Sequence, residues 1–251
     1  MTQMLASVTS VAEARLALAL GADIIDLKNP HAGALGALPL PTLLSIVAAI
    51  DGRRTVSATI GDTPDDASRI AQKVFATAAT GIDIVKIGVA ANRSQLALWQ
   101  GMAWLASPRL ATGLGTEPVS TRLVAVLFAD HPFDLGWVDI FAEIGFHGVM
   151  LDTADKHAGG LRTHCDDGQL RNFVHRAHSK HLACGLAGSL RLDDISPLLA
   201  LSPDYLGFRG ALCHNTSRTD QLDADAFRAV RAGIPVDGGN HTLTRAVASA
   251  A

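Results

Sequence analysis

Short apolar runs alternate along the chain with longer amphipathic or alanine-rich stretches. The apolar, β-branched runs predict eight strands, at Met4–Thr9, Ala22–Lys28, Thr55–Ile60, Ile82–Val89, Arg122–Ala129, Gly148–Asp152, Leu182–Ala187 and Asp204–Arg209. The stretches that follow them predict eight helices, at Val11–Leu20, Pro41–Ala49, Asp65–Thr80, Ser94–Leu105, Trp137–Ile144, Gly168–Lys180, Leu192–Leu199 and Asp223–Ala232. The strands are apolar over nearly their whole length, as parallel strands are when both of their faces are buried.

Eight strand–helix repeats suit a closed barrel. A strand, a helix and a second parallel strand form a right-handed βαβ unit, and eight such units make a (β/α)₈, or TIM, barrel. A doubly wound open sheet is the alternative, but it usually has a glycine fingerprint after its first strand, and Ser7–Ser10 contains no glycine. We therefore expect residues 1–251 to form a single α/β TIM-barrel domain.

Glycines and two irregular segments refine this prediction. The segment Ala106–Thr121 is rich in Pro, Gly and Thr and predicts a surface excursion, and residues 234–251 are interpreted as a C-terminal extension. Glycines just after helical stretches predict left-handed helix caps at Gly21, Gly81, Gly145 and Gly233.

Composition argues against several classes of function. The formal net charge is −3 and there is no basic run, so we expect no nucleic-acid partner. No apolar run reaches the roughly 20 residues of a membrane-spanning helix, and the first ten residues lack the pattern of a secretory signal. The three cysteines are widely spaced and form no CxxC pair, so we expect no disulfide framework and a cytoplasmic location.

Charged residues interrupt the C-terminal ends of the even-numbered strands. A buried strand does not carry a charge unless that charge is paired or used. In a TIM barrel the active site lies at the C-terminal mouth, and alternate strands contribute side chains to a common layer. We therefore expect one polar cluster, made of Asp26, Lys28, Lys86, Asp152 and Arg209, with Lys156 reaching in from the loop after the sixth strand.

Lysine is rare in this chain, which contains five lysines among 21 basic residues. Unlike a guanidinium, an amine can lose its proton and attack a carbonyl carbon. Burial and neighbouring positive charge lower the pKa of a lysine, which then suits it to imine formation or to general-base catalysis. Asp26 and Asp152 oppose that shift, so the sequence leaves open which amine stays charged. Ion pairs that only hold the mouth together are the structural alternative.

The loops after the seventh and eighth strands predict a phosphate site. In this fold, phosphate often binds to backbone N–H groups of these two loops. The residues expected to contribute are Gly188, Ser189, Arg209 and Gly210, although ordinary tight turns are the alternative. The ten histidines do not predict a metal site, because neither His175/His178/His181 nor His157/His164/Cys165 adjoins a carboxylate in a known ligand spacing.

At this point the motifs become specific. The stretch Gly21–Pro30 (GADIIDLKNP), with its trailing glycines, resembles the start of the (5-formylfuran-3-yl)methyl phosphate synthases, also called 4-(hydroxymethyl)-2-furancarboxaldehyde-phosphate synthases. The resemblance extends from Ser7 to about Cys213. Its further matches are Val56–Asp62, Val85–Gly88, Met150–Ala154, Leu186–Ser189 and Arg209–Ala211. The segment His214–Arg218 departs from the glycine-richer loop expected of the family.

The resemblance implies a lyase that condenses two molecules of glyceraldehyde 3-phosphate into a phosphorylated furan aldehyde, with release of phosphate and water. This product is a precursor of methanofuran-type one-carbon carriers. By the matching motifs, Lys28 would form the Schiff base, Lys86 would accept a proton, and Asp26, Asp152 and Lys156 would support them. The implied chemistry needs no metal and no redox cofactor.

Other functions and partners stay open on the sequence alone. The same lysine logic fits another Schiff-base aldolase that acts on sugar phosphates, and the phosphate loops alone fit a non-catalytic sugar-phosphate-binding barrel. A homo-oligomer is one interpretation of the apolar face Leu96/Leu98/Trp99/Met102, although burial in the core is the commoner outcome for such a face.

Overall fold

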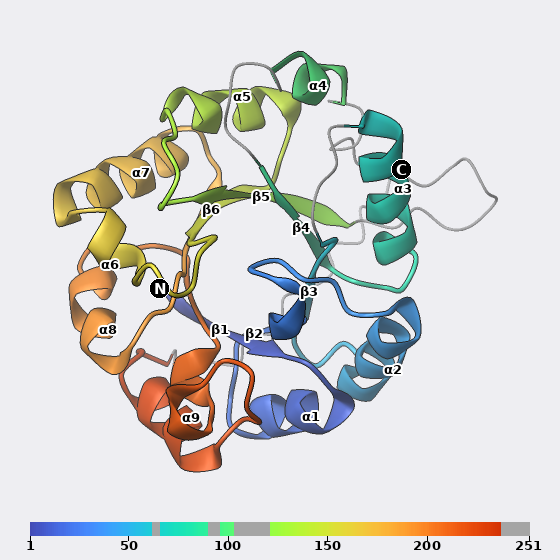
Figure 1. Ribbon diagram of the computed structural model, residues 1–251, viewed down its shortest axis with the longest axis vertical. Coiled ribbons are helices and arrows are strands. Elements are labelled where there is room, and N and C mark those ends of the chain that lie inside the picture. The colour runs from blue at the N-terminus through green and yellow to red at the C-terminus, as the bar shows by residue number, and fades with distance from the viewer. Residues whose placement is uncertain (62–65, 90–95, 103–120, 237–251) are drawn as a thin grey trace, which may run out of the picture.

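The computed structural model describes residues 1–61, 66–89, 96–102 and 121–236. Eight parallel strands follow one another in chain order and close into a barrel, because β8 pairs with β1 (Figure 1). The strands are β1 (Gln3–Val8), β2 (Ile24–Leu27), β3 (Thr55–Thr59), β4 (Ile84–Gly88), β5 (Arg122–Phe128), β6 (Gly148–Asp152), β7 (Ala183–Leu186) and β8 (Tyr205–Phe208). The TIM barrel expected from the sequence is therefore confirmed.

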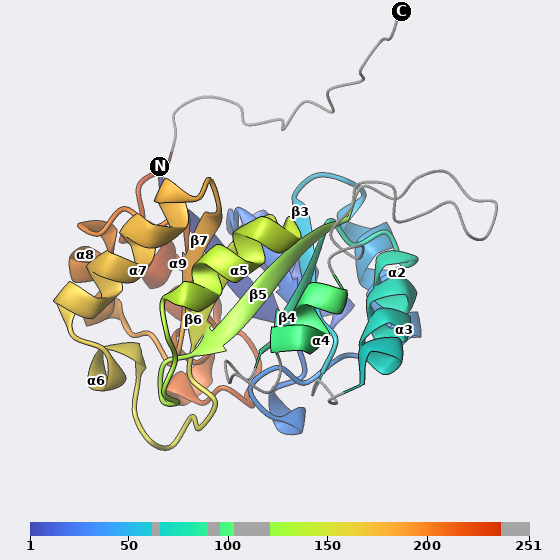
Figure 2. The same cartoon turned by 90° about the horizontal axis from the view of Figure 1, so that it is seen from above.

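Helices surround the ring of strands (Figure 1). Those at the predicted places are α1 (Val11–Ala19), α2 (Leu40–Ile50), α3 (Ala67–Ala78), α4 (Leu96–Gly101), α5 (Gly136–Ile144), α7 (Asp167–Ser179), α8 (Leu192–Leu199) and α9 (Ala224–Ala232). Short elements too brief for periodicity to reveal are α6 (Leu161–His164) and the 3₁₀ turns η1 (Pro30–Ala32), η4 (Gly210–Leu212) and η5 (His214–Thr216). Figure 2 shows α6 at the edge of the barrel toward which the arrow of β5 points.

Local chemistry accounts for many helix ends. The α7 helix begins with a capping box in which Asp166 and Gln169 satisfy each other's backbone N–H groups. Gly21, Gly81 and Gly145 have φ of 85°, 86° and 96°, so three of the four left-handed caps expected from the sequence are confirmed.

The expectation for the fourth glycine was wrong. Gly233 has φ of −78° and lies in the right-handed region. A Cβ at this position would lie 3.0 Å from Cδ1 of Ile195, a close contact that glycine avoids.

The interior of the barrel is apolar below its C-terminal mouth. The side chains that fill it include Leu5, Ile24, Ile84, Val124, Met150 and Tyr205. Gly185 makes room for the Tyr205 ring, because a Cβ on Gly185 would lie 2.1 Å from a ring carbon. Side chains two positions further along a strand point into the barrel one layer higher. The residues after this apolar layer therefore face the mouth.

Several expectations concern surfaces and termini. Within the described ranges no helix is both long enough and apolar enough to cross a membrane. Trp99 and Met102 are buried, and Leu96 and Leu98 pack against the core, so that face is used inside the chain. Most of the excursion expected at 106–121 and of the extension expected at 234–251 lies outside the described residues.

Candidate active site

The structure brings together five of the charged residues predicted to cluster at the mouth. Asp26 lies near the end of β2 and Lys28 follows that strand, Lys86 lies on β4, Asp152 ends β6, and Lys156 is in the loop after β6. Asp26 is completely buried, and Lys86 and Asp152 are each 2% exposed. Their charges lie in a space with little water, where each one needs a partner.

Two ion-paired groups form within this cluster. In the deeper group the Lys86 Nζ lies 2.7 Å from Oδ1 of Asp26. In the outer group two ammonium groups share Asp152, with Lys156 Nζ 2.5 Å from Oδ1 and Lys28 Nζ 3.6 Å from Oδ2.

Odd-numbered strands also contribute to the site, which the sequence analysis missed. Ser7 on β1 and Ser57 on β3 donate their hydroxyls to opposite oxygens of Asp26, at 2.9 and 2.7 Å. Thr59 donates to the carbonyl oxygen of Gly36 and so ties the end of β3 to the loop after β2. A signal was present in β3, where Ser57 and Thr59 alternate with apolar residues. The hydroxyls of Ser7 and Ser57 and the amine of Lys86 therefore all contact Asp26, and together they hold its carboxylate in one orientation.

Burial and charge act on the pKa values of these groups in opposite directions. Burial alone would raise the pKa values of Asp26 and Asp152, but the neighbouring ammonium groups outweigh it and lower both. Burial lowers the pKa of Lys86, and the charge of Lys28 adds to this effect while Asp26 opposes it. Burial also lowers the pKa of Lys156 against the pull of Asp152. Both carboxyl groups therefore stay ionised, whereas these two amines lose a proton more readily than a free lysine.

The three amines differ in their hydrogen bonds. Lys86 is held by Asp26, and Lys156 donates to Asp152 and, at 3.1 Å, to Oγ1 of Thr153. Within the part of the chain that the structure describes, the Lys28 amine makes no hydrogen bond, and its nearest carboxylate oxygen is 3.6 Å away. Lys28 is also 8% exposed, more than Lys86. Among the described residues it therefore makes fewer hydrogen bonds than the amines of Lys86 and Lys156.

The glycine-containing loops predicted to bind phosphate lie after β7 and β8. Gly188 has φ of 112°, and a Cβ there would lie 3.0 Å from Cγ2 of Thr153. Ser189 is exposed and left-handed, with φ of 49°. Among the described residues, no hydrogen-bond acceptor meets the backbone N–H groups of Gly188, Ser189 or Gly210. Unpaired N–H groups in these two loops are the donors that a phosphate site of this fold uses.

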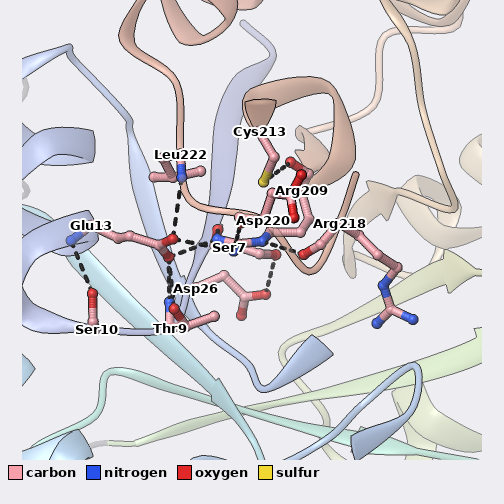
Figure 3. Close-up of polar contacts among 10 residues, drawn as sticks. All are labelled: Ser7, Thr9, Ser10, Glu13, Asp26, Arg209, Cys213, Arg218, Asp220 and Leu222. Carbon is pink, nitrogen blue, oxygen red and sulfur yellow. Dashed lines mark hydrogen bonds and ion pairs between the residues drawn. The ribbon is translucent and has the colours of Figure 1, made fainter. Parts of the chain in front are cut away.

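Arg209 was expected both in the polar cluster and as a phosphate ligand, but its contacts are different. Its guanidinium forms a buried pair with Glu13 of α1, through contacts of 2.7 and 3.2 Å (Figure 3). Its other hydrogen bonds go to the carbonyl oxygens of Ser7, Arg218 and Asp220. All five N–H groups of the guanidinium are thus engaged, which leaves none for a phosphate.

A long sequence separation explains this difference. Glu13 and Arg209 are 196 positions apart, and only the closure of β8 onto β1 brings them together. Burial alone would raise the pKa of Glu13, but the bonds to Arg209 outweigh it and keep the pKa low. We refer to this ion pair as the Glu13–Arg209 clasp.

Breaking the clasp is expected to destabilise the barrel. Arg209→Met should lower the free energy of unfolding by about 3–5 kcal/mol, because it leaves the Glu13 carboxylate buried without its cation. Urea unfolding followed by circular dichroism measures this change. Arg228→Met, which removes an exposed arginine from α9, is the matched control and should leave the midpoint unchanged. Equal midpoints for the two variants would contradict the stabilising role of the clasp.

Removing both partners gives a second reading of the same pair. In the double variant Glu13→Leu/Arg209→Met no buried charge is left unpaired, so this variant should be more stable than Arg209→Met alone. If the double variant were less stable than Arg209→Met, an unpaired Glu13 carboxylate could not be the cause of the instability of Arg209→Met.

The described ranges contain neither a cluster of metal ligands nor a disulfide. No group of three or more His, Cys, Asp or Glu side chains there is arranged to hold a metal ion. Cys165, Cys184 and Cys213 are free and buried. Burial raises the pKa of the Cys213 thiol to about 11, which keeps it protonated at neutral pH.

Comparisons with known proteins show which family model, which relatives and which solved structure this chain resembles. The model of the 4-HFC-P synthase family matches residues 4–231. A (5-formylfuran-3-yl)methyl phosphate synthase of Methanopyrus kandleri is 34% identical over 86% of this chain and 91% of its own length. A Methylorubrum extorquens protein that carries the same name as a provisional assignment is 40% identical over 94% of both chains. The crystal structure of phosphoribosyl anthranilate isomerase from Thermus thermophilus has a TM-score of 0.61 at 14% identity, covers 93% of this chain and 98% of its own, and shares the fold.

Proposed function

The chain belongs to the 4-HFC-P synthase family, and from this we propose that it condenses two molecules of glyceraldehyde 3-phosphate through a Schiff base on Lys28. The product would be (5-formylfuran-3-yl)methyl phosphate, with phosphate and water released. In the cell this compound would serve as a precursor of methanofuran-type one-carbon carriers.

The contrast between Lys28 and Lys86 is the observation that carries this proposal. Near the mouth, the Lys28 amine makes no hydrogen bond to any residue that the structure describes. Lys86 is a buried amine whose pKa is lowered. A nucleophilic amine and a base of lowered pKa in one poorly hydrated site are what imine chemistry requires. Asp152 contacts both Lys28 and Lys156, and so can orient the nucleophile.

The reaction divides into steps that these residues can perform. The Lys28 nitrogen attacks the aldehyde carbon of one substrate, and loss of water gives the imine. The imine acidifies the adjacent C–H bond, and Lys86 removes that proton to leave an enamine. Phosphate then leaves from the neighbouring carbon and a carbon–carbon bond forms with the second substrate molecule, and these two steps can occur in either order. Ring closure with loss of two water molecules gives the furan, and hydrolysis of the imine by one water molecule releases it and restores the Lys28 amine.

Charge at the mouth favours a phosphorylated substrate. Before substrate enters, with all three amines protonated, the site holds three ammonium groups, on Lys28, Lys86 and Lys156, beside the two carboxylates of Asp26 and Asp152. The positive charge in excess would be neutralised by an anionic ligand. The backbone N–H groups of Gly188, Ser189 and Gly210, which meet no acceptor among the described residues, are the donors that we propose for one substrate phosphate.

A product assay tests the proposed function. We expect the purified chain, given glyceraldehyde 3-phosphate, to form a furan aldehyde with its ultraviolet absorbance and to release one phosphate for each furan. Reversible cleavage of a sugar phosphate without phosphate release would favour the alternative Schiff-base aldolase. Absence of both reactions, with substrate binding retained, would favour a non-catalytic sugar-phosphate-binding barrel.

A further inference from the structure

Arg218 lies in the loop between β8 and α9, and the Glu13–Arg209 clasp holds its backbone. The Nε–H of Arg209 donates to the carbonyl oxygen of Arg218 at 2.9 Å, and an Nη2–H donates to that of Asp220 at 2.7 Å. Two carbonyl groups on either side of Thr219 are therefore bonded to one buried guanidinium. The backbone at Arg218 is fixed from inside the barrel wall.

The side chain of Arg218 extends away from the clasp (Figure 3). One of its Nη2–H groups donates to the carbonyl oxygen of Gly33, in the loop after β2, at 2.8 Å. Within the described chain its other N–H groups meet no hydrogen-bond acceptor, and the residue is half-buried. Most of the hydrogen-bonding capacity of this guanidinium is therefore free.

Charge around Asp152 is unbalanced in a way that concerns Arg218. Lys28 and Lys156 already share the carboxylate of Asp152. Arg218 adds a third cation to this mouth, because its guanidinium is bonded to Gly33 in the loop after β2. The charge of Asp152 raises the pKa of this guanidinium, although burial lowers that pKa overall. Three cations around one buried carboxylate leave positive charge that the described residues do not neutralise. A doubly charged phosphate group would balance it.

We propose that Arg218 binds a phosphate group of the substrate over Lys28 and Lys156, at an anion site separate from the Gly188–Ser189 turn. A guanidinium offers two parallel N–H donors that match two phosphate oxygens. The clasp directs this residue by holding its carbonyl group. The identity of the phosphate as part of a triose phosphate rests on the function proposed above, but the presence of an anion site does not.

Titration with inorganic phosphate tests this site without any turnover. Calorimetry of the full chain should detect phosphate binding, and Arg218→Gln should remove or weaken one binding event by about tenfold or more, the effect of losing a charged hydrogen bond. Arg218→Lys should keep part of the affinity, because it keeps the charge and loses the fork of donors. Arg228→Gln removes an exposed arginine of α9 and should titrate like the wild type.

Kinetics separate phosphate binding from a purely structural role. With glyceraldehyde 3-phosphate, Arg218→Gln should raise KM more than it lowers kcat, with an unchanged urea midpoint. A wild-type chain that binds no phosphate, or an Arg218→Gln variant with wild-type phosphate titration and KM, would overturn the inference. If no furan forms but Arg218→Gln still loses phosphate binding, only the proposed function fails. If furan forms and Arg218→Gln behaves as wild type, only this inference fails.

Discussion

Lys28→Arg is expected to abolish furan formation while the barrel stays folded. Arginine keeps the positive charge beside Asp152, but its guanidinium stays protonated and cannot form an imine. The loss should be on the order of 10⁴-fold or more, as when other enzymes lose a nucleophile. Steady-state assay of the furan product measures it, with urea unfolding to verify the fold.

Chemical trapping tests the same prediction independently. Borohydride added to wild-type chain and glyceraldehyde 3-phosphate should reduce the imine and leave the substrate mass on the peptide that contains Lys28. Lys28→Arg should trap nothing, and Lys180→Arg, which changes a surface lysine paired with Asp139, should trap normally. Adduct on the peptide of Lys86 or Lys156 would assign the nucleophile to that residue and refute the role of Lys28.

The second large effect concerns the base. Lys86→Arg is expected to keep the ion pair with Asp26 and to lower turnover by roughly 10²–10⁴-fold, the range for loss of a general base. Borohydride should still trap the imine on Lys28, because proton removal follows imine formation. Lys86→Met tests the same role with the cation removed. This variant should also be less stable, because the buried Asp26 carboxylate would lose its paired ammonium group.

The pH dependence of turnover identifies the base more closely. A free lysine has a pKa of about 10.4. Burial lowers the pKa of Lys86, so its neutral, proton-accepting form becomes available at a lower pH than in a free lysine. Wild-type turnover should therefore rise with pH and level off once Lys86 is deprotonated. In Lys86→Arg that rise should be absent. A normal product yield, or the same rise with pH, would exclude Lys86 as the base.

The fold and most of the charged cluster follow from patterns that are local in the sequence. Alternation along a strand decides which side chains point into the barrel, so Asp26 and Lys28, two positions apart, had to share one face. The even-numbered strands then place Lys86 and Asp152 in the same mouth. A buried strand that nevertheless carries charge is visible in the sequence without any coordinates.

Pairing between those charges needed the closed structure. The sequence offered Arg209 to the cluster and to phosphate, but the acceptor that engages it, Glu13, comes from the opposite end of the chain. The partners of Asp26 on β1 and β3 were also unseen, because single serines in apolar strands have many ordinary explanations. Likewise, the contacts of the lysine amines become visible only in the folded barrel. Lys86 and Lys156 are bonded to carboxylates there, whereas the nearest carboxylate oxygen to the Lys28 amine is 3.6 Å away.

By itself the sequence determined the barrel, the inward faces of its strands and the lysines that enter the mouth, because backbone geometry converts residue spacing directly into direction. The tertiary structure alone decided that Arg209 pairs with Glu13 and that Arg218 donates to Gly33. It also decided that, among the described residues, the Lys28 amine is the one without a hydrogen bond. Hydrogen bonds and ion pairs act over a few ångströms. Which groups pair is therefore decided by their separation in space once the barrel has closed. Their separation along the sequence does not reveal that spatial distance.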